Sequence, residues 1–298
     1  MAANPQTIEE LDRAAPRARW IAAATHFVRH RPLGAIGAAI ILLMVALAAT
    51  AGYIAPFNPL ENDYAAMLAA PSAEHWLGTD AFGRDVFSRI VYGSRTALMV
   101  GLGASLIGAI FGSLIGVASA YFGGRVDMLV QRVMDVLFAF PVIILALVVV
   151  AVLGTGAGNV ILAIATPMVP RCARVVRSAE LSAREMPYVD AARAAGFGHS
   201  RIILRHMLPN VMAPILIMAT AFLGEAILLE ASLSFLGLGV QEPTAAWGLM
   251  LRGAAVDFAE TAPWMAIFPG LAISLAVFGF NLFGDSLRDA LDPRLRTH

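Results

Sequence analysis

The sequence predicts an all-α integral membrane protein with six transmembrane helices, and three observations support this fold class. Of the 298 residues, 59% are hydrophobic and only 14% are charged, whereas charged residues make up about 25% of an ordinary soluble domain. The apolar residues form long uncharged runs, and short segments between them hold nearly all of the arginines. Since a helix needs about 20 apolar residues to cross the hydrocarbon core, these runs are the predicted spans.

The first span is predicted from the uncharged run at 33–54. We therefore assign 1–32 to a cytoplasmic N-terminal segment and 33–55 to a first transmembrane anchor helix. Arginines precede this run, as they precede the apolar region of a secretory signal, but such a region is only about 7–15 residues long. We expect the helix to be retained as an anchor.

A long periplasmic segment is predicted at 56–95. Near its end, four apolar residues recur at helical spacing and form one face: Val86, Phe87, Ile90 and Val91. We expect this stretch to be an amphipathic helix lying along the membrane surface. It leads into the second span, an uncharged run at 96–122 whose many glycines and small residues favour close packing against another helix.

The third and fourth spans are predicted from one uncharged stretch at 136–170. It is too long for a single span, so we expect a helical hairpin divided at Gly154-Thr155-Gly156. Pro141 removes one helix hydrogen bond and is expected to bend the third span. The fourth span is expected to continue past Arg171.

The last two spans are predicted at 211–236 and 263–283. The fifth contains Glu225 and Glu230 within apolar sequence. A carboxylate costs roughly 2.5–3.5 kcal/mol at the centre of a membrane helix on insertion scales, so both must face protein or water. Two interpretations stay open: they line a translocation path, or they bond to neighbouring helices.

The distribution of arginines predicts the orientation, because cytoplasmic segments of membrane proteins are enriched in basic residues. With the N-terminus inside, only Arg84, Arg89, Arg95 and Arg252 lie outside, which leaves 17 of the 21 basic residues in the cytoplasm. We therefore place both termini in the cytoplasm, with a five-helix core at 96–286 and a cytoplasmic tail at 287–298.

Two smaller features concern charges near the predicted inner boundary. Arg132 and Asp135 are three residues apart and are expected to pair on one helix face. The arginines at 171, 174 and 177 are expected to mark the inner membrane boundary, with contacts to lipid headgroups or to a partner protein as alternatives.

Several kinds of chemistry are excluded by composition. Every basic residue is an arginine, so the chain has no lysine for a phosphate-binding P-loop or for a Schiff base. The single cysteine, Cys172, cannot form an intrachain disulfide. The six histidines show no metal-binding spacing. We therefore predict no catalytic residue, no cofactor site and no metal site, and a protein that is not an enzyme.

The segment at 186–210 is the most informative loop of the chain. Its alanine-rich first part favours a helix, which Gly196 is placed to end in a left-handed conformation. Ser200 is expected to cap a second helix, and Pro209 to end it. The pattern predicts two short helices joined by a sharp glycine turn at the cytoplasmic surface.

This segment resembles the EAA loop of bacterial ABC-importer permeases, in which Glu-Ala-Ala is followed by a glycine and later by His-x-Leu-Pro. The matching residues are Asp190, Ala191, Ala192, Gly196, His206, Leu208 and Pro209. Asp190 stands where the family often has glutamate, which keeps the charge and shortens the side chain by one methylene. The resemblance implies that this loop couples the chain to an ATPase subunit.

Further motifs are similar to the dipeptide/oligopeptide/nickel branch of these permeases, and within it to the C-type member of a permease pair. They occur in the family's order from about residue 75 to the end of the chain. They are His75-Trp-Leu-Gly-Thr-Asp80, Leu233-Ser-Phe-Leu-Gly-Leu-Gly-Val-Gln241, Phe280-Asn-Leu-Phe-Gly-Asp285 and Leu287-Arg-Asp-Ala-Leu-Asp-Pro-Arg294.

The resemblance implies a type I ABC-importer permease fold and a function. The chain would be the permease subunit of an ATP-driven importer that moves short peptides or similar small solutes across the bacterial inner membrane by alternating access. Its partners would be a homologous second permease, two ABC ATPase subunits that use ATP and Mg, and a periplasmic or extracellular solute-binding protein. The solute stays open among dipeptides, oligopeptides, glutathione-like compounds and nickel complexes.

An ion-gradient-driven secondary transporter is the alternative. In such a protein, Glu225 and Glu230 would be ion sites inside the membrane. That interpretation gives no account of the loop at 186–210.

Overall fold

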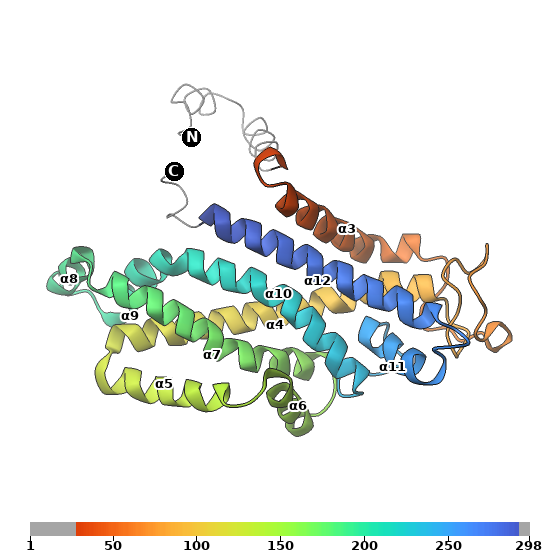
Figure 1. Ribbon diagram of the computed structural model, residues 1–298. Helices are drawn as coiled ribbons and strands as arrows, with labels where there is room; N and C mark the ends of the chain where they lie inside the picture. The colour runs from red at the N-terminus through yellow and green to blue at the C-terminus, as the bar shows by residue number, and fades with distance from the viewer. Residues whose placement is uncertain (1–27, 292–298) are drawn as a thin grey trace.

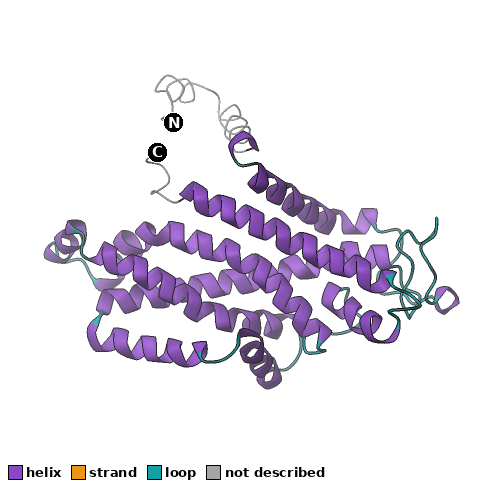
Figure 2. Cartoon of the chain, in the orientation of Figure 1, coloured by secondary structure: helices purple, strands orange, loops and turns teal. Residues whose placement is uncertain are grey.

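The computed structural model describes residues 28–291 and shows an elongated, nearly all-helical molecule without strands in that range (Figures 1 and 2). The main helices are α3 (Pro32–Ile54), α4 (Val86–Phe122), α5 (Gly124–Phe138), α6 (Val142–Leu153), α7 (Ala157–Arg184), α8 (Pro187–Ala194), α9 (His199–Ile202), α10 (Met212–Phe235), α11 (Trp247–Asp257) and α12 (Trp264–Leu291). Short helical turns lie at Tyr64–Ala66, Ile203–Met207 and Leu208–Val211. The predicted all-α membrane fold is confirmed.

Five helical stretches in the described part of the chain are long and apolar enough to cross a bilayer: α3, α4, α7, the run from α9 to α10, and α12. A sixth crossing requires α5 and α6 together, and these two helices meet at an angle of 93°. The third span, predicted at the start of 136–170 with a bend at Pro141, is instead divided there into two helices. Pro141 begins α6 instead of bending a continuous helix, because the residue before a proline disfavours helical geometry.

Helix α4 is the central element and packs most extensively against α7. Glycines spaced by four residues, Gly108, Gly112 and Gly116, bring the two backbones close together. A Cβ at Gly112 would lie 2.5 Å from the Cβ of Cys172, and one at Gly116 would lie 2.5 Å from the carbonyl oxygen of Ala173. The prediction that this span packs closely against another helix is confirmed.

Helices α3 and α12 pack together along the upper edge in Figure 1. They cross at Gly37 and Gly279, where a Cβ on Gly37 would lie 2.7 Å from the carbonyl oxygen of Gly279. Beside the start of α3, Arg31 donates a hydrogen bond to the carbonyl of Ser286 at 2.7 Å. The start of α3 and the last turns of α12 therefore lie at the same end of the molecule, which is also the end that carries α8 (Figure 1).

The beginning of α4 differs from the prediction. The amphipathic stretch is the first turn of α4, which starts at Val86 instead of 96, so there is no separate helix on the membrane surface. Arg89, expected on a polar outer face, is fully buried. It donates a hydrogen bond to the carbonyl of Pro59 at 2.8 Å and lies 3.9 Å from Glu242, which draws the two long loops at this end onto α4.

The end of the sixth span also differs, because α12 continues to Leu291 and includes the start of the predicted tail at 287–298. The greater part of the predicted N-terminal segment, residues 1–27, and the last part of the tail, residues 292–298, lie outside the described residues.

The packing of α4 against α7 gives a first prediction. We expect Gly112→Ala to lower the thermal unfolding temperature in detergent, because the added methyl group overpacks the contact with Cys172 at a cost of about 1–3 kcal/mol. Gly270→Ala in α12 is the matched control. Nothing lies within 4 Å of its added Cβ, and alanine favours a helix over glycine by up to about 1 kcal/mol. Equal unfolding temperatures for the two variants would contradict the close contact.

Candidate functional site

The predicted loop at 186–210 begins with α8, which the local sequence favours. Pro187 occupies the first turn, where its missing N–H is not needed. Asp190 lies in the same turn, where a negative charge is stabilised by the helix dipole. Its carboxylate accepts a hydrogen bond from Arg193 at 3.2 Å, three residues later.

Gly196 ends α8 with φ +75°, in the left-handed region that glycine adopts without strain. Its N–H bonds to the carbonyl of Arg193 at 3.0 Å, and the N–H of Phe197 bonds to the carbonyl of Ala192 at 3.1 Å. These two bonds form a Schellman motif. Nothing lies within 4 Å of a Cβ placed on Gly196. Glycine is therefore required here by the backbone angle, and not by a lack of space for a side chain.

Helix α8 has one buried face and one exposed face of small side chains. Val189 and Ala192 are buried in the main hydrophobic core. Asp190, Ala191 and Ala194 are exposed on the opposite side, where α8 lies at the extreme end of the molecule (Figure 1). A helix with alanines on its free face lets another protein approach its backbone closely.

The return path from α8 was predicted only in part. Helix α9 begins at His199 with Gly198 at its cap, so the predicted capping role of Ser200 was wrong. Pro209 does not end the helix either. The chain passes through a π-turn at Ile203–Met207 and a 3-10 turn at Leu208–Val211 into α10. The wider turn accommodates the ring of Pro209, which would otherwise clash with the carbonyl four residues earlier.

Of the other predicted loop residues, His206 and Leu208 lie on the inner side of this return. The ring of His206 stacks on Phe197 at 5.8 Å between centroids, and its Nε2 is buried without a hydrogen-bond partner among the described residues. Leu208 packs against the main core, and Pro209 is exposed. The structure therefore separates the predicted set into exposed residues and inward-facing residues. The exposed ones are Asp190, Ala191, Gly196 and Pro209, and the inward-facing ones are Ala192, His206 and Leu208.

Residues missed by the sequence interpretation hold the loop against the helices. The hydroxyl of Tyr121, at the end of α4, lies 2.7 Å from Nδ1 of His199. Arg184 donates a hydrogen bond to the carbonyl of Ala120 at 3.0 Å. Asn210 donates one to the hydroxyl of Tyr188 at 2.7 Å. No local motif marks these pairs, since their members are 22 to 78 residues apart in sequence.

Tyr188 lies near the buried acid Glu180. Burial and, second, the negative charge of Glu180 raise the pKa of Tyr188 above its usual value, while its hydrogen bond from Asn210 acts in the opposite direction. Glu180 is fully buried, and neither of its carboxylate oxygens has a hydrogen-bond partner among the described residues. Tyr188 therefore stays protonated and neutral beside this acid.

The three arginines of α7 have different partners from those predicted. Arg171 bonds Glu225 of α10 with 2.6 Å between Nη1 and Oε1, in the middle of both helices. Arg174 pairs with Asp135 of α5 at 2.9 Å, in place of the predicted Arg132–Asp135 pair. Arg177 pairs with Asp127 of α5. The three side chains join α5 and α10 to α7 and do not all mark one membrane boundary.

Glu230 has a different environment from Glu225. Its side chain is almost completely buried and accepts a hydrogen bond from Ser234 at 2.7 Å. The Ser234 hydroxyl in turn accepts from the N–H of Val240 at 3.2 Å. Glu230 thus holds the turn after α10, whereas Glu225 is partly exposed on the surface of that helix.

In the described part of the chain, no three His, Cys, Asp or Glu side chains come together in a way that would hold a metal ion. Cys172 is free and buried against the carbonyl of Ala109.

Comparison with known families finds two matches along the chain. A family described as "Binding-protein-dependent transport system inner membrane component" matches residues 108–297. A second, described as "N-terminal TM domain of oligopeptide transport permease C", matches residues 19–71. Together they include α3, α8 and the arginines of α7.

Individual relatives match over most of their length. The chain is 45% identical over 270 residues to the dipeptide transport system permease protein DppC of Alkalihalophilus pseudofirmus, covering 91% of this chain and 88% of the relative. It is 44% identical over 259 residues to the glutathione transport system permease protein GsiD of Pectobacterium atrosepticum, covering 86% and 85%. The fold is similar to a chain of the inward-facing MetNI methionine ABC transporter, with a TM-score of 0.55 at 20% identity, covering 69% of this chain and 97% of that one.

The Schellman motif gives a second prediction. We expect Gly196→Ala to open the loop, because a left-handed conformation costs a residue with a Cβ about 1–2 kcal/mol. This cost corresponds to roughly a five- to thirtyfold larger opened population. Tryptic cleavage after Arg193 and Arg201 should accelerate accordingly. The control is Gly198→Ala, where φ is −65° and no atom lies within 4 Å of the added Cβ. Equal cleavage rates for the two variants would show that Gly196 does not hold the turn.

Proposed function

Since this chain belongs to the family of binding-protein-dependent transport system inner membrane components, we propose that it is the C-type permease of an ATP-driven importer of short peptides in a bacterial inner membrane. The observation that carries the proposal is the exposed alanine face of α8 at the end of the molecule, held at a fixed angle by Gly196. The relatives named for dipeptide and glutathione transport support the substrate class.

The proposed partners are the parts of an importer that this chain does not supply. This chain has no lysine for a nucleotide-binding P-loop, so ATP and Mg are bound by two separate ABC ATPase subunits. Helix α8 docks on one of them, with Asp190 and Ala191 toward the ATPase. A homologous second permease completes the translocation path, and an external binding protein delivers the solute. The chain itself carries no catalytic site.

We place the α8 end in the cytoplasm. The described ends of α3 and α12 lie at this same end, and most of the arginines outside the helix centres gather there. Both termini of the chain are then cytoplasmic, and α11 faces the outside. ATP hydrolysis would thus act on the same side as the docking helix.

Of the two membrane carboxylates, we assign Glu225 to the translocation path. It is partly exposed at the middle of α10, whereas Glu230 is enclosed and bonded to Ser234. The ion-driven alternative has no support, because the matching families and relatives are permeases of binding-protein-dependent and peptide import systems. The acids it would use as ion sites are already bonded to Arg171 and Ser234.

A substitution on the exposed face of α8 tests the docking proposal. We expect Ala191→Trp to abolish stoichiometric co-purification of the ATPase subunits from cells expressing the neighbouring genes. It should also lower peptide uptake about tenfold or more, since overpacking costs about 1–3 kcal/mol and each 1.4 kcal/mol is a factor of ten. The permease should remain folded in the membrane, because Ala191 packs against nothing on its outer side.

Arg125→Trp is the matched control, since Arg125 is exposed near the same end of the molecule but lies at the start of α5. This variant should retain the ATPases and transport. Co-purification and uptake that are normal for Ala191→Trp would remove α8 from the docking surface. Recovery of the wild-type chain without any ATPase in mild detergent would contradict the importer itself.

A further inference from the structure

The ion pair between Arg171 and Glu225 lies deep within the membrane helices. Arg171 is about 21 Å along α7 from Ala157, and Glu225 is about 15 Å from the end of α10 at Phe235, at a rise of about 1.5 Å per residue. The hydrocarbon layer is about 30 Å thick, so both distances are shorter than its thickness. The two helices run side by side here (Figure 1).

The pair is also exposed, which is unusual for charges at this depth. The side chain of Arg171 is 39% exposed and that of Glu225 is 29% exposed in the single chain. Charged side chains at the membrane centre face protein or a water-filled cavity. This side of α7 and α10 is therefore not a lipid-facing surface.

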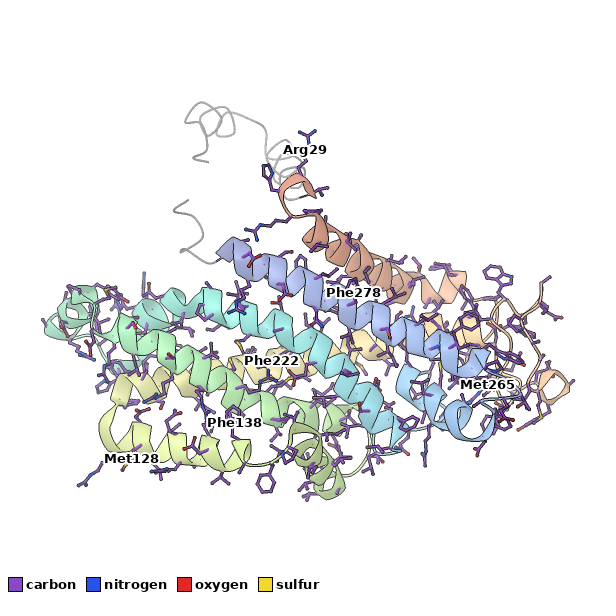
Figure 3. All side chains as sticks on the ribbon, viewed as in Figure 1. Arg29, Met128, Phe138, Phe222, Met265 and Phe278 are labelled. Carbon is purple, nitrogen blue, oxygen red and sulfur yellow. The ribbon has the colours of Figure 1, made fainter. Side chains whose placement is uncertain are left out.

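Helix α12 provides the contrast on the same molecule. Its large exposed side chains at helical spacing are apolar, namely Ile267, Leu271, Leu275 and Phe278, and Ser274 is exposed among them. Figure 3 shows Phe278 on this outer surface. On α10, the strip that contains Glu225 also carries Ala221, Leu228 and Ser232. The two strips differ in the charged side chain of Glu225, which has no counterpart among the exposed residues of α12 named here.

The guanidinium of Arg171 retains free bonding capacity. Both of its hydrogen bonds to Glu225 come from Nη1. Among the described residues, Nε and Nη2 donate no hydrogen bond, which leaves the edge of the guanidinium that matches a carboxylate in a two-bond arrangement. Arg174 is paired differently, because it donates through Nη2 to Asp135.

We propose that Arg171 and Glu225 form a site for the charged ends of a peptide in transit. The guanidinium binds the C-terminal carboxylate, and the Glu225 carboxylate binds the N-terminal ammonium group. The inference rests on the proposed function and adds a recognition site within this chain for zwitterionic peptides. Their free termini are the chemical class that it selects.

An exchange of partners makes such a site workable inside a membrane. In the empty site, each charge is neutralised by the other. When a peptide enters, each protein charge exchanges its partner for one of opposite sign on the peptide, so neither is left unpaired at low dielectric. Leaving one unpaired would cost several kcal/mol. A peptide with blocked termini offers no such exchange and leaves the internal pair closed.

The test measures access to the site and its occupancy separately. The complete importer, with Cys172→Ala and Ala221→Cys in this chain, is reconstituted in lipid nanodiscs. Ala221 is exposed one helical turn from Glu225. We expect a charged methanethiosulfonate reagent to label this cysteine. It should not label a cysteine at Leu275, which lies on the apolar surface of α12.

Occupancy is read as protection from labelling. Alanine peptides of two to four residues with free termini should slow the reaction, and the same peptides acetylated and amidated should not. Arg171→Gln or Glu225→Gln should raise the half-protecting peptide concentration about tenfold or more, the value of one or two charge-assisted hydrogen bonds. Arg174→Gln, which removes a neighbouring ion pair on α7, should leave it unchanged.

Two results would overturn the inference, and the second would also overturn the assignment of Glu225 to the translocation path. If Ala221→Cys is labelled but free and blocked peptides protect it equally, or neither protects it, the charged ends are not recognised, while the proposed function stands. If an importer that transports peptides is never labelled at this cysteine, then this surface lies outside the path. The assignment of Glu225 to the path then fails as well, and the docking role of α8 is untouched.

Discussion

Close contact between the backbones of α4 and α7 is the constraint on which the other features depend. Side chains of any size at Gly112 or Gly116 would collide with the main chain of α7 or with its first side-chain atoms. In a bilayer, helices associate through such packing because lipid is as apolar as leucine and offers no hydrophobic driving force. The contact fixes where α7 lies, and α7 in turn places the three arginines and leads directly into α8.

Electrostatics then sets how the outer helices are arranged around this pair. Arg171, Arg174 and Arg177 follow one another at helical spacing, and each finds a carboxylate on a neighbouring helix. Because unpaired charges are costly in hydrocarbon, these partners restrict how far α5 and α10 can move from α7. The cost of an unpaired charge also explains the surroundings of Arg89. This side chain is fully buried at the start of α4, and loop carbonyls and the acids Asp80 and Glu242 surround it.

Much of the helical order could be read from the sequence, because uncharged runs of sufficient length are governed by a local rule. The turn at Gly196 was likewise predictable from its local motif. A bend at Pro141 was also predictable, but its angle of 93° was not, since apolar composition does not indicate in which direction a helix runs. Ion pairs such as Arg174–Asp135 join residues 39 positions apart. The sequence pattern favoured the nearer partner Arg132, and only the packing of α5 on α7 decides between them.

The unbroken course of the chain from His199 to Phe235 has a mechanical consequence. This stretch of 37 residues is a rod about 55 Å long at a rise of about 1.5 Å per residue, and α8 is attached to one end by a turn of a few residues. A tilt of α8 is therefore carried into the membrane as a tilt of the rod, and it arrives at Glu225 as a lateral displacement. The π-turn at Ile203–Met207 lies between α8 and α10, so its stiffness determines how much of the tilt reaches α10.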